Sequence, residues 1–431
     1  MGKTRTIKVE ALSRVEGEGG LFVRLNGDVV EEVQLRIFEP PRLFEALLRG
    51  RSLEEVPDIT ARICGICPVA YQMSSVHALE AALGVAISPE IRRLRRLLYC
   101  GEWIESHALH VHFLHAPDFL GYDSGIDLAR DHRNEVNRGL RLKKHGNQLL
   151  EVLGGRAIHP INVAVGGFYK APRRDEFSAL VPDFEWGLEA AMETTRWVAG
   201  FDFPDFNQNY EMVAVVHPDE YAMNEGRVTS SSGQSWTADQ YESAFVEEHV
   251  PHSTALQSVR QPQGTNYLVG PLARLNLSRE RLAPRARQLA DDLNVELPCL
   301  NPFKAIIARG LELVHAYEEA LDILRTYEPP QRPRVVYSYR AGEGCAATEA
   351  PRGLLYHRYI VDDAGHVTLA TIIPPTSQNQ RQIEADLREY LPQILKGDDQ
   401  ATALGCERLV RSYDPCISCS THFLKVTLDR G

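Results

Sequence analysis

One stretch near the carboxyl end of the chain decides the fold: Arg411-Ser412-Tyr413-Asp414-Pro415-Cys416-Ile417-Ser418-Cys419-Ser420-Thr421-His422. It brings two thiols, a carboxylate and an imidazole into one short segment. A second Cys-x-x-Cys pair lies near the other end of the chain, in Arg62-Ile63-Cys64-Gly65-Ile66-Cys67. The two pairs can form one four-thiolate site only if the fold brings the two ends together. We therefore expect the intervening residues to join the ends and to bury the site.

The composition is that of a soluble globular protein, with 44% hydrophobic and 24% charged residues in 431. The net charge of −11 argues against nucleic acid or an anionic membrane as the main partner, because phosphate binding needs clustered cations. The one basic cluster, Arg92 to Arg96, is better explained as a solvated or interface helix face. No apolar run approaches the roughly 18–20 residues that span a bilayer, and the first residues lack a signal-peptide core. We expect a cytoplasmic protein without direct membrane insertion, although a signal on a partner subunit would not be visible here.

The eight cysteines divide into two pairs and four single residues, which are Cys100, Cys299, Cys345 and Cys406. This density is too low for a disulfide scaffold. Paired Cys-x-x-Cys in a large, cytoplasmic chain indicates metal or redox chemistry. The single cysteines are expected to be small buried hydrophobes.

The hydrophobic pattern predicts β structure over residues 7–37, with a hairpin at Asn26-Gly27, and a short helix over 43–48. Further helices are expected at 71–84, 89–114, 134–153, 183–199, 279–292, 303–327 and 381–395. A strand is expected at 334–339 and a second hairpin at 356–361 and 366–373. The fold class is therefore α+β and predominantly helical, with a long-helix bundle core and small β-hairpin or sheet regions near both termini.

Four thiolates alone are compatible with a closed structural zinc site. Two observations favour a reactive site instead. A site assembled from both ends needs the whole fold to hold it, and Arg62, Asp414 and His422 place polar groups beside the thiolates, where they can tune a metal and relay protons. Cys64 and Cys67 also precede a helix, whose N-terminus favours thiolate.

The motifs Arg62-x-Cys64-Gly65-x-Cys67 and Asp414-Pro415-Cys416-x-x-Cys419-x-x-His422 resemble the two signatures of the large, catalytic subunit of nickel–iron hydrogenases. Other segments resemble motifs of the same family in the same order along the chain. They are Arg14-Val15-Glu16-Gly17, Phe44-Glu45-x-x-Leu48-Arg49-Gly50-Arg51, Ser106-His107-Ala108-Leu109-His110, Gly155-Arg156-x-x-His159-Pro160 with Gly166-Gly167, and Glu349-Ala350-Pro351-Arg352-Gly353. The resemblance runs from about residue 7 to 422 and implies the large-subunit fold.

The resemblance also implies the metal ligands. Cys64 and Cys416 would bind nickel terminally, and Cys67 and Cys419 would bridge nickel and iron. The iron would carry carbon monoxide and two cyanides. Soft thiolates suit nickel.

Further roles are implied for residues around the metals. Glu16 would relay protons toward the surface. Arg352 would lie over the open edge of the metal pair, and Asp414 and Pro351 would line the same cavity. Glu45 and His422 would bind magnesium with a backbone carbonyl near Thr371, and Pro375 and Thr376 would contact a cyanide.

The implied reaction is the reversible, heterolytic splitting of H2, with the proton passing to a thiolate or to a base beside Arg352. The electrons must leave through an iron–sulfur small subunit, because the single cysteines have no cluster-binding spacing. Tyr71 stands where many members have His, Ser106 where membrane-bound uptake members have Asp, and Thr376 where many have Ser. These departures resemble the cytoplasmic bidirectional branch, which implies flavin and iron–sulfur subunits that reduce NADP or NAD.

The resemblance implies one domain over residues 1–431, in which an N-terminal β region with a short helix (7–60) precedes a helical core (61–330) and a C-terminal β/α region (331–422). It also implies a maturation chaperone and an endopeptidase that cleaves between His422 and Phe423, which would remove 423–431. A permanent terminal strand is the alternative for this segment.

Simpler interpretations stand beside these. A quinone-pocket subunit of a respiratory complex would share the fold but lack the four cysteines, and a zinc-stapled structural protein would keep them. Glu16 alone would be a turn carboxylate and Glu45 a solvated helix residue. The histidines of the long helix, His107, His110, His112 and His115, are expected to be core or interface residues rather than ligands.

Overall fold

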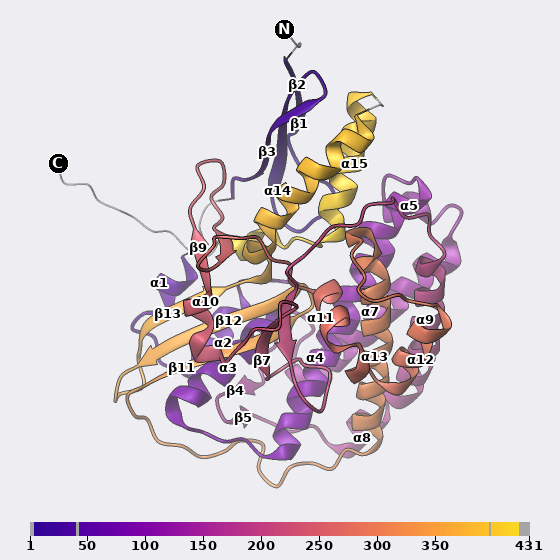
Figure 1. Cartoon of the computed structure of the whole chain (residues 1–431). Coiled ribbons are helices and arrows are strands. Elements are labelled where there is room, and N and C mark those ends of the chain that lie inside the picture. Colours follow the sequence, from indigo (N-terminus) through magenta and orange to yellow (C-terminus); the bar gives the residue numbers. More distant parts are fainter. Residues whose placement is uncertain (1–3, 40–42, 396–397, 422–431) are drawn as a thin grey trace, which may run out of the picture.

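The computed structural model describes residues 4–39, 43–395 and 398–421. The expected magnesium ligand His422 and the expected cleaved segment 423–431 lie outside the described residues. Within them, long helices form one side of the molecule, and small antiparallel sheets, among them those of residues 4–37 and 342–373, lie apart from that side (Figure 1). The expected α+β, predominantly helical class is confirmed.

The helical core is built on α4 (Pro89–Leu109), which packs against α7 (Arg133–Gly154) and α13 (Ala305–Arg325), while α9 (Val181–Ala199) packs on α13. The predicted start of α4 is confirmed, since Ser88 Oγ accepts the Ile91 amide at 3.3 Å. The predicted helix over 89–114 continues beyond α4 as a π-helical turn, His110–His115, followed by α5 (Ala116–Leu120). The four histidines of this stretch are buried, as expected.

The N-terminal sheet has the order β1 (Thr4–Val9), β2 (Gly19–Asn26), β3 (Val29–Ile37), all antiparallel. Asn26 pairs with Val29, so the predicted hairpin is confirmed, but its turn residues are Gly27 and Asp28 rather than the predicted Asn26 and Gly27. Gly27 has φ of +62°, which a glycine adopts without steric cost. The sheet packs on α14 (Pro375–Ile394).

The C-terminal sheet has the order β11 (Gly342–Ala350), β12 (Gly353–Val361), β13 (Val367–Ile373). The hairpin β12–β13 was predicted, but β11 was not. Its glycines permit the strand to lie directly on α3 (Pro68–Leu83): a Cβ on Gly344 would approach the Ala78 carbonyl oxygen to 2.1 Å. This packing places the hairpin β11–β12 beside the first cysteine pair.

Three sequence predictions were wrong. Residues 334–339 form no strand but an extended surface segment with one bridge, Gly167 to Arg334, because the neighbouring segment around Gly167 and Phe168 pairs with it only at its first residues. The helix expected over 279–292 is divided into a 3-10 turn, Arg279–Arg281, and α12 (Pro284–Asp292), since Pro284 has no amide hydrogen for a preceding turn. The last helix begins earlier than residue 381, and a further helix, α15 (Asp399–Ser412), was not foreseen.

The remaining elements are short. The helices are α1 (Phe44–Leu48), α2 (Val56–Ala61), α6 (Gly125–Leu128), α8 (Arg174–Ser178), α10 (Tyr241–Ala244), α11 (Pro271–Ser278) and α16 (Ile417–Ser420), with 3-10 turns at Ala238–Gln240 and Pro302–Lys304. The strands are β4 (Val163–Ala164), β5 (Gly167–Phe168), β6 (Val213–Val216), β7 (Arg227–Ser230), β8 (Ser235–Trp236), β9 (Phe245–Glu248) and β10 (Gln257–Arg260). Among the described helices, none combines the length and the apolar character that crossing a bilayer requires.

Segments from the N-terminal and C-terminal parts of the chain meet in the interior, as the cysteine spacing predicted. Glu16 and Cys416 form an isolated parallel bridge, and the Ile417 amide donates to the Glu16 carbonyl at 2.9 Å. The loop after β1 is thereby joined to the segment that follows α15.

Candidate metal centre

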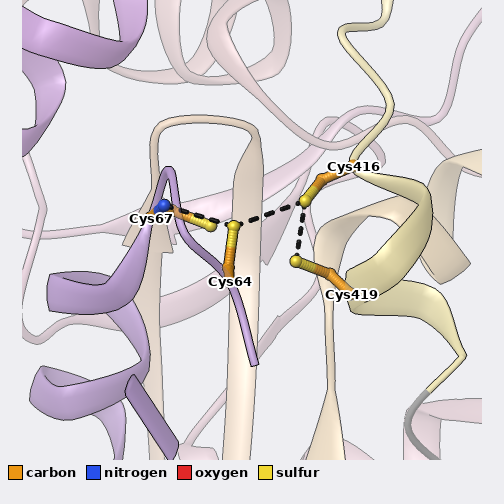
Figure 2. A group of neighbouring side chains, drawn as sticks. All are labelled: Cys64, Cys67, Cys416 and Cys419. Atoms are coloured by element: carbon orange, nitrogen blue, oxygen red, sulfur yellow. Dashed lines mark hydrogen bonds between the residues drawn. The ribbon is translucent and has the colours of Figure 1, made fainter. Parts of the chain in front are cut away.

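The structure brings four thiols together, those of Cys64, Cys67, Cys416 and Cys419, with all sulfur atoms within 4.8 Å of one another (Figure 2). Cys64 Sγ lies 3.5 Å from Cys416 Sγ, and Cys416 Sγ lies 2.8 Å from Cys419 Sγ. All four residues are buried. In the described part of the chain this is the one such group of potential ligands, and the four single cysteines take no part in it.

The first pair lies in the turn between α2 and α3. Cys64 Sγ accepts the amides of Ile66 at 3.3 Å and of Cys67 at 3.2 Å, and Cys67 is the N-cap of α3. The pair thus begins a helix, as expected. Sequence reasoning missed Glu102 of α4, which is fully buried and accepts the amides of Val69 and Ala70 at the start of the same helix. No motif marks this glutamate, and its contact depends on the packing of α4 against α3.

The second pair begins directly after α15. Asp414 has φ of +55°, which turns the chain sharply before Pro415. The Cys416 amide then donates to Thr376 Oγ1 at 3.0 Å, and Cys419 lies within α16. Thr376 and Pro375 open α14, so the start of this helix holds the second cysteine pair.

Crowding makes the four thiols electrostatically unlike free cysteines. Hydrogen bonds from the other three thiols lower the pKa of Cys64 well below its ordinary value. Burial raises the pKa of Cys416 well above it, and that of Cys419 is raised by burial as well. Four thiolates so close together repel one another unless cations compensate them. The donor set therefore fits soft metal ions, which displace the thiol protons on binding.

Arg352 is the buried cation of the site. It occupies the tip of the hairpin β11–β12, where Pro351 and Arg352 form the turn. Its Nε donates to the Asp414 carbonyl at 2.8 Å and its Nη2 to Asp414 Oδ1 at 3.1 Å. Burial opposes the charge of Arg352, but Asp414 and the thiolates raise its pKa well above the ordinary value.

Arg352 Nη1 and Asp414 Oδ2 are buried and find no hydrogen-bond partner among the described residues. An orphaned donor and an orphaned acceptor in one buried site are costly in a closed protein interior. They indicate a small polar or ionic group beside the thiols. Together with the four sulfur donors, they fit a bound metal centre with groups of its own.

Glu16 contacts the second cysteine pair directly. Cys416 Sγ donates to Glu16 Oε2 at 3.1 Å, and the Ser418 amide donates to the same oxygen at 3.1 Å. Glu16 is only partly buried. It therefore connects a buried thiol with the outer layer of the protein, a position from which a carboxylate can receive a proton.

Glu45 and Thr371 line one hollow of about 630 Å³ between α1, β9 and β13. Glu45 Oε1 accepts the Ile372 amide at 2.7 Å. Burial raises the pKa of Glu45 to about 8. A divalent cation in this hollow would restore the charged form, so the environment fits the expected magnesium site; its third expected ligand, His422, lies outside the described residues.

Two departures noted in the sequence are also buried here. Tyr71 lies in α3 with its hydroxyl without a partner among the residues that the structure describes. Burial raises its pKa well above the ordinary value, and the thiols of Cys419 and Cys67 reinforce the effect. Ser106 Oγ in α4 is likewise buried and finds no partner in the described ranges.

A family model described as nickel-dependent hydrogenase matches residues 42–135 and 259–422. The alpha chain of sulfhydrogenase 1 from Pyrococcus furiosus is 34% identical and aligns over 97% of this chain and 98% of its own. The alpha chain of sulfhydrogenase 2 from the same organism is 32% identical over 97% of this chain and 100% of its own. The beta chain of the NAD-reducing hydrogenase HoxS from Cupriavidus necator is 26% identical over 98% and 95%.

Solved structures agree with these relatives. An NAD+-reducing [NiFe]-hydrogenase in the H2-reduced state superposes with a TM-score of 0.86 at 27% identity, covering 98% of this chain and 100% of that one. A [NiFeSe]-hydrogenase of Dm. baculatum superposes with a TM-score of 0.76 at 22% identity over 97% and 100%, which shows the shared fold alone. The sequence and the structure thus resemble the same group of proteins over almost their whole length.

Proposed function

The chain belongs to the nickel-dependent hydrogenase family as a catalytic large subunit, and from this premise we propose that it splits H2 reversibly in a cytoplasmic complex that reduces NADP or NAD. One observation carries the proposal: four thiols from both ends of the chain converge beside the Arg352–Asp414 pair. The NAD-reducing relatives support the proposed electron acceptor. The reaction class itself follows from the family.

Cys64 and Cys416 would hold nickel terminally, and Cys67 and Cys419 would hold both nickel and iron. The iron would carry carbon monoxide and two cyanides, with Pro375 and Thr376 near one cyanide. The bound metal pair would supply the site at which H2 is polarised and split. Glu45, a Thr371 carbonyl and His422 would hold magnesium.

The protein's own groups would manage the proton and the developing charge. A proton on Cys416 Sγ moves to Glu16 Oε2 along the 3.1 Å hydrogen bond and from there outward. The Arg352 guanidinium is fixed by two hydrogen bonds to Asp414, so it presents a cation without reorganising. Pro351 would line the same site beside Arg352, and its carbonyl is held by Arg274 Nη2 at 2.9 Å.

Metal analysis combined with infrared spectroscopy tests this function. We expect nickel and iron in equal amounts and the stretching bands of bound carbon monoxide and cyanide. Zinc in place of both metals, without these bands, would favour the zinc-stapled alternative. H2-dependent reduction of NADP and NAD by the purified complex then identifies the acceptor, and inactivity with both would refute the proposed electron route.

Cleavage between His422 and Phe423 is proposed as the last step of maturation, by an endopeptidase acting after a chaperone has delivered the metals. Mass spectrometry of nickel-loaded protein tests it. An intact carboxyl end at Gly431 in active enzyme would show that the segment is permanent.

Replacing Glu16 by glutamine should slow proton transfer about 100-fold, because an amide cannot accept the thiol proton. Two reactions of H2 separate this effect from damage to the metals. Exchange of D2 with solvent protons needs the relay, whereas conversion of para-H2 to ortho-H2 needs only splitting and recombination. We expect the first to fall and the second to persist. Equal exchange rates in the Glu16→Gln and parent enzymes would remove Glu16 from the proton path.

The implied small subunit has a suitable docking face near Cys64. Segments 154–170 and 333–340 lie side by side, since Val335 N donates to Gly166 O and Phe168 N to Pro333 O, both at 2.9 Å. His159 Nδ1 lies 2.8 Å from the Ala61 carbonyl oxygen, which joins this face to the turn of the first pair. Large exposed apolar side chains gather here, namely those of Ile158, Ile161, Tyr169, Val336 and Tyr339.

Val336→Asp should weaken the binding of the small subunit by at least about tenfold, because Val336 is 81% exposed on this face and a charge would be buried on docking. Co-purification and H2-dependent NAD(P) reduction measure the loss. Val29→Asp is the matched control, since Val29 is 66% exposed on the N-terminal hairpin at the other end of the molecule (Figure 1). Equal co-purification of both variants would place the interface elsewhere.

A further inference from the structure

We propose that Asp118 is a positioning residue for the proton relay: its carboxylate holds Arg14 and Arg411 together and thereby fixes the hydrogen bond between Cys416 and Glu16. The proposal rests on the role of Glu16 argued above. Asp118 lies in α5, directly after the π-helical turn, and touches neither the thiols nor Glu16 in any hydrogen bond of the described residues. Its effect would be transmitted through the two arginines.

The contacts of Asp118 form a closed clamp. Oδ1 accepts Arg14 Nη2 at 2.5 Å and Arg411 Nη2 at 2.8 Å, while Oδ2 accepts Arg411 Nε at 2.7 Å. The side chains of Asp118 and Arg411 are 6% and 1% exposed. Charge-assisted bonds of this length in a buried position are strong and geometrically specific.

One arm of the clamp leads to Glu16. Arg14 lies two residues before it, in a loop where Arg14 itself has φ of +56°. Its Nη1 donates to the Leu114 carbonyl at 2.9 Å, and Arg411 Nη1 donates to the Ser13 carbonyl at 3.0 Å. A positive φ is uncommon for arginine, so contacts with surrounding residues must hold the backbone of Arg14 in this conformation. These bonds hold it and set where the Glu16 carboxylate lies.

The other arm leads to Cys416. Arg411 occupies the last turn of α15, and its carbonyl oxygen lies 2.8 Å from His110 Nε2. The chain then passes through Asp414, the second non-glycine residue of the site with positive φ, to Cys416. The position of Arg411 therefore determines where this turn begins and where Cys416 Sγ points.

The charges explain why a carboxylate is needed. The two guanidinium groups repel each other, and Arg411 contributes to the lowered pKa of Arg14, after burial. Burial disfavours the ionised form of Asp118, but the bonds and charge of Arg411 outweigh it and keep its pKa below the ordinary value. Glu407 supplies a second negative charge, on Arg411 Nη1 at 2.7 Å. Without Asp118, the buried guanidinium of Arg411 and the partly buried one of Arg14 would face each other without the carboxylate that joins them, and they would separate.

A small separation is enough to matter. Proton transfer requires the thiol and the carboxylate to stay within hydrogen-bond distance, and misplacement by about 1 Å can slow a reaction about 100-fold. The Cys416–Glu16 bond of 3.1 Å is a close contact for a sulfur donor, so a displacement of about 1 Å would break it. If either arm of the clamp loosens, the rate of proton transfer should therefore fall before metal binding is affected.

Asp118→Asn in the intact holoenzyme tests the proposal, because the amide keeps the size but offers one acceptor and less charge. We expect exchange of D2 with solvent protons to fall about tenfold, while para-H2 conversion and the metal content stay within twofold. We also expect faster deuterium uptake at the amides of Ile417 and Ser418, which bond to Glu16. This second readout does not depend on activity.

Asp131→Asn is the matched control, because it removes the same charge from a carboxylate that accepts the exposed Tyr122 hydroxyl, away from the clamp. It should change neither readout. Arg14→Gln is a milder second variant that cuts only the arm to Glu16, and it should reproduce the exchange defect. Equal losses in D2 exchange and para-H2 conversion, or unchanged amide protection in Asp118→Asn and Arg14→Gln, would overturn the clamp.

Glu16→Gln separates this proposal from the relay on which it rests. With a working relay, adding Asp118→Asn to Glu16→Gln should cause no further loss of D2 exchange, whereas a further tenfold loss would show that Asp118 acts elsewhere. If Glu16→Gln alone leaves D2 exchange intact, the relay is refuted. The clamp is then judged by amide protection, where faster uptake supports it and unchanged uptake overturns it.

Discussion

Replacing Cys419 by serine is expected to abolish hydrogen uptake, with a loss of at least about 1,000-fold. Cys419 Sγ lies 2.8 Å from Cys416 Sγ, inside the group of four sulfur atoms. A serine hydroxyl is a hard donor that stays protonated at neutral pH, so it would neither attract a soft metal nor balance its charge. Nickel and iron content, the infrared bands of carbon monoxide and cyanide, and uptake should all disappear together.

Cys345→Ser provides the control for this loss. Cys345 is a half-buried cysteine on β11 whose sulfur accepts the Tyr356 hydroxyl at 3.3 Å and lies outside the four-thiol group. The same change of sulfur to oxygen there should leave metals and activity within twofold. If Cys419→Ser keeps both metals and its activity, the four-thiol site is not the reaction centre.

The meeting of the two chain ends could be predicted because cysteine spacing encodes it. Cys64 and Cys67 have no partners nearby in the sequence, and a buried thiolate site needs more ligands than one pair supplies. Two local motifs therefore predict a contact between segments that are far apart in the sequence. The hairpin at Asn26-Gly27 was equally accessible, since its turn chemistry is contained within a few residues.

Sequence patterns did not predict the elements whose structure depends on packing against other segments of the chain. Gly342 to Ala350 has few residues typical of strands, yet it forms β11 because its glycines fit against α3. Residues 334–339 have the opposite character: valine and tyrosine suggested a strand, but in the described residues the pairing with the segment around Gly167 amounts to a single bridge at Arg334, too little to form a strand. Strand propensity depends on context in this way, and sequence alone does not supply the context.

The sequence also did not predict Glu102 and Asp118, two acidic residues that contact the segments around the site. Glu102 lies in a helix that the pattern predicted, whereas Asp118 lies in α5, beyond the predicted end at residue 114, and the partners of both are distant in the chain. A carboxylate on a helix is usually solvated, so neither position stands out. Only the packing of α4 and α5 against the two cysteine segments gives these acids their contacts.

Arg352→Lys is expected to lower the rate of hydrogen uptake about 100- to 1,000-fold with the metals retained, the usual cost of losing one preorganised charge-stabilising donor. Arg352 is 2% exposed and uses Nε and Nη2 to bond Asp414, which leaves Nη1, without a partner among the described residues, for the proposed metal centre. A lysine ammonium is a single point of charge and cannot bond Asp414 in two places while extending a third donor.

The backbone next to Arg352 prevents the hairpin tip from shifting. Gly353 follows Arg352 with φ of +135°, and a Cβ there would approach the Gly270 nitrogen to 2.8 Å. The tip of the hairpin thus packs against a second segment and cannot move to let a shorter side chain reach the proposed metal centre. Unchanged infrared bands in Arg352→Lys would show that the metals are in place while uptake is measured.

Arg358→Lys on the same sheet is the matched control, since Arg358 is half-buried and pairs with Glu242 and Glu343 away from the thiols. It should retain uptake within twofold, because a partly exposed ion pair tolerates exchange of one cation for another. Full uptake in Arg352→Lys would mean that any cation near Asp414 suffices. A fixed guanidinium with a free donor would then have no part in the chemistry, and the orphaned Nη1 would need another explanation.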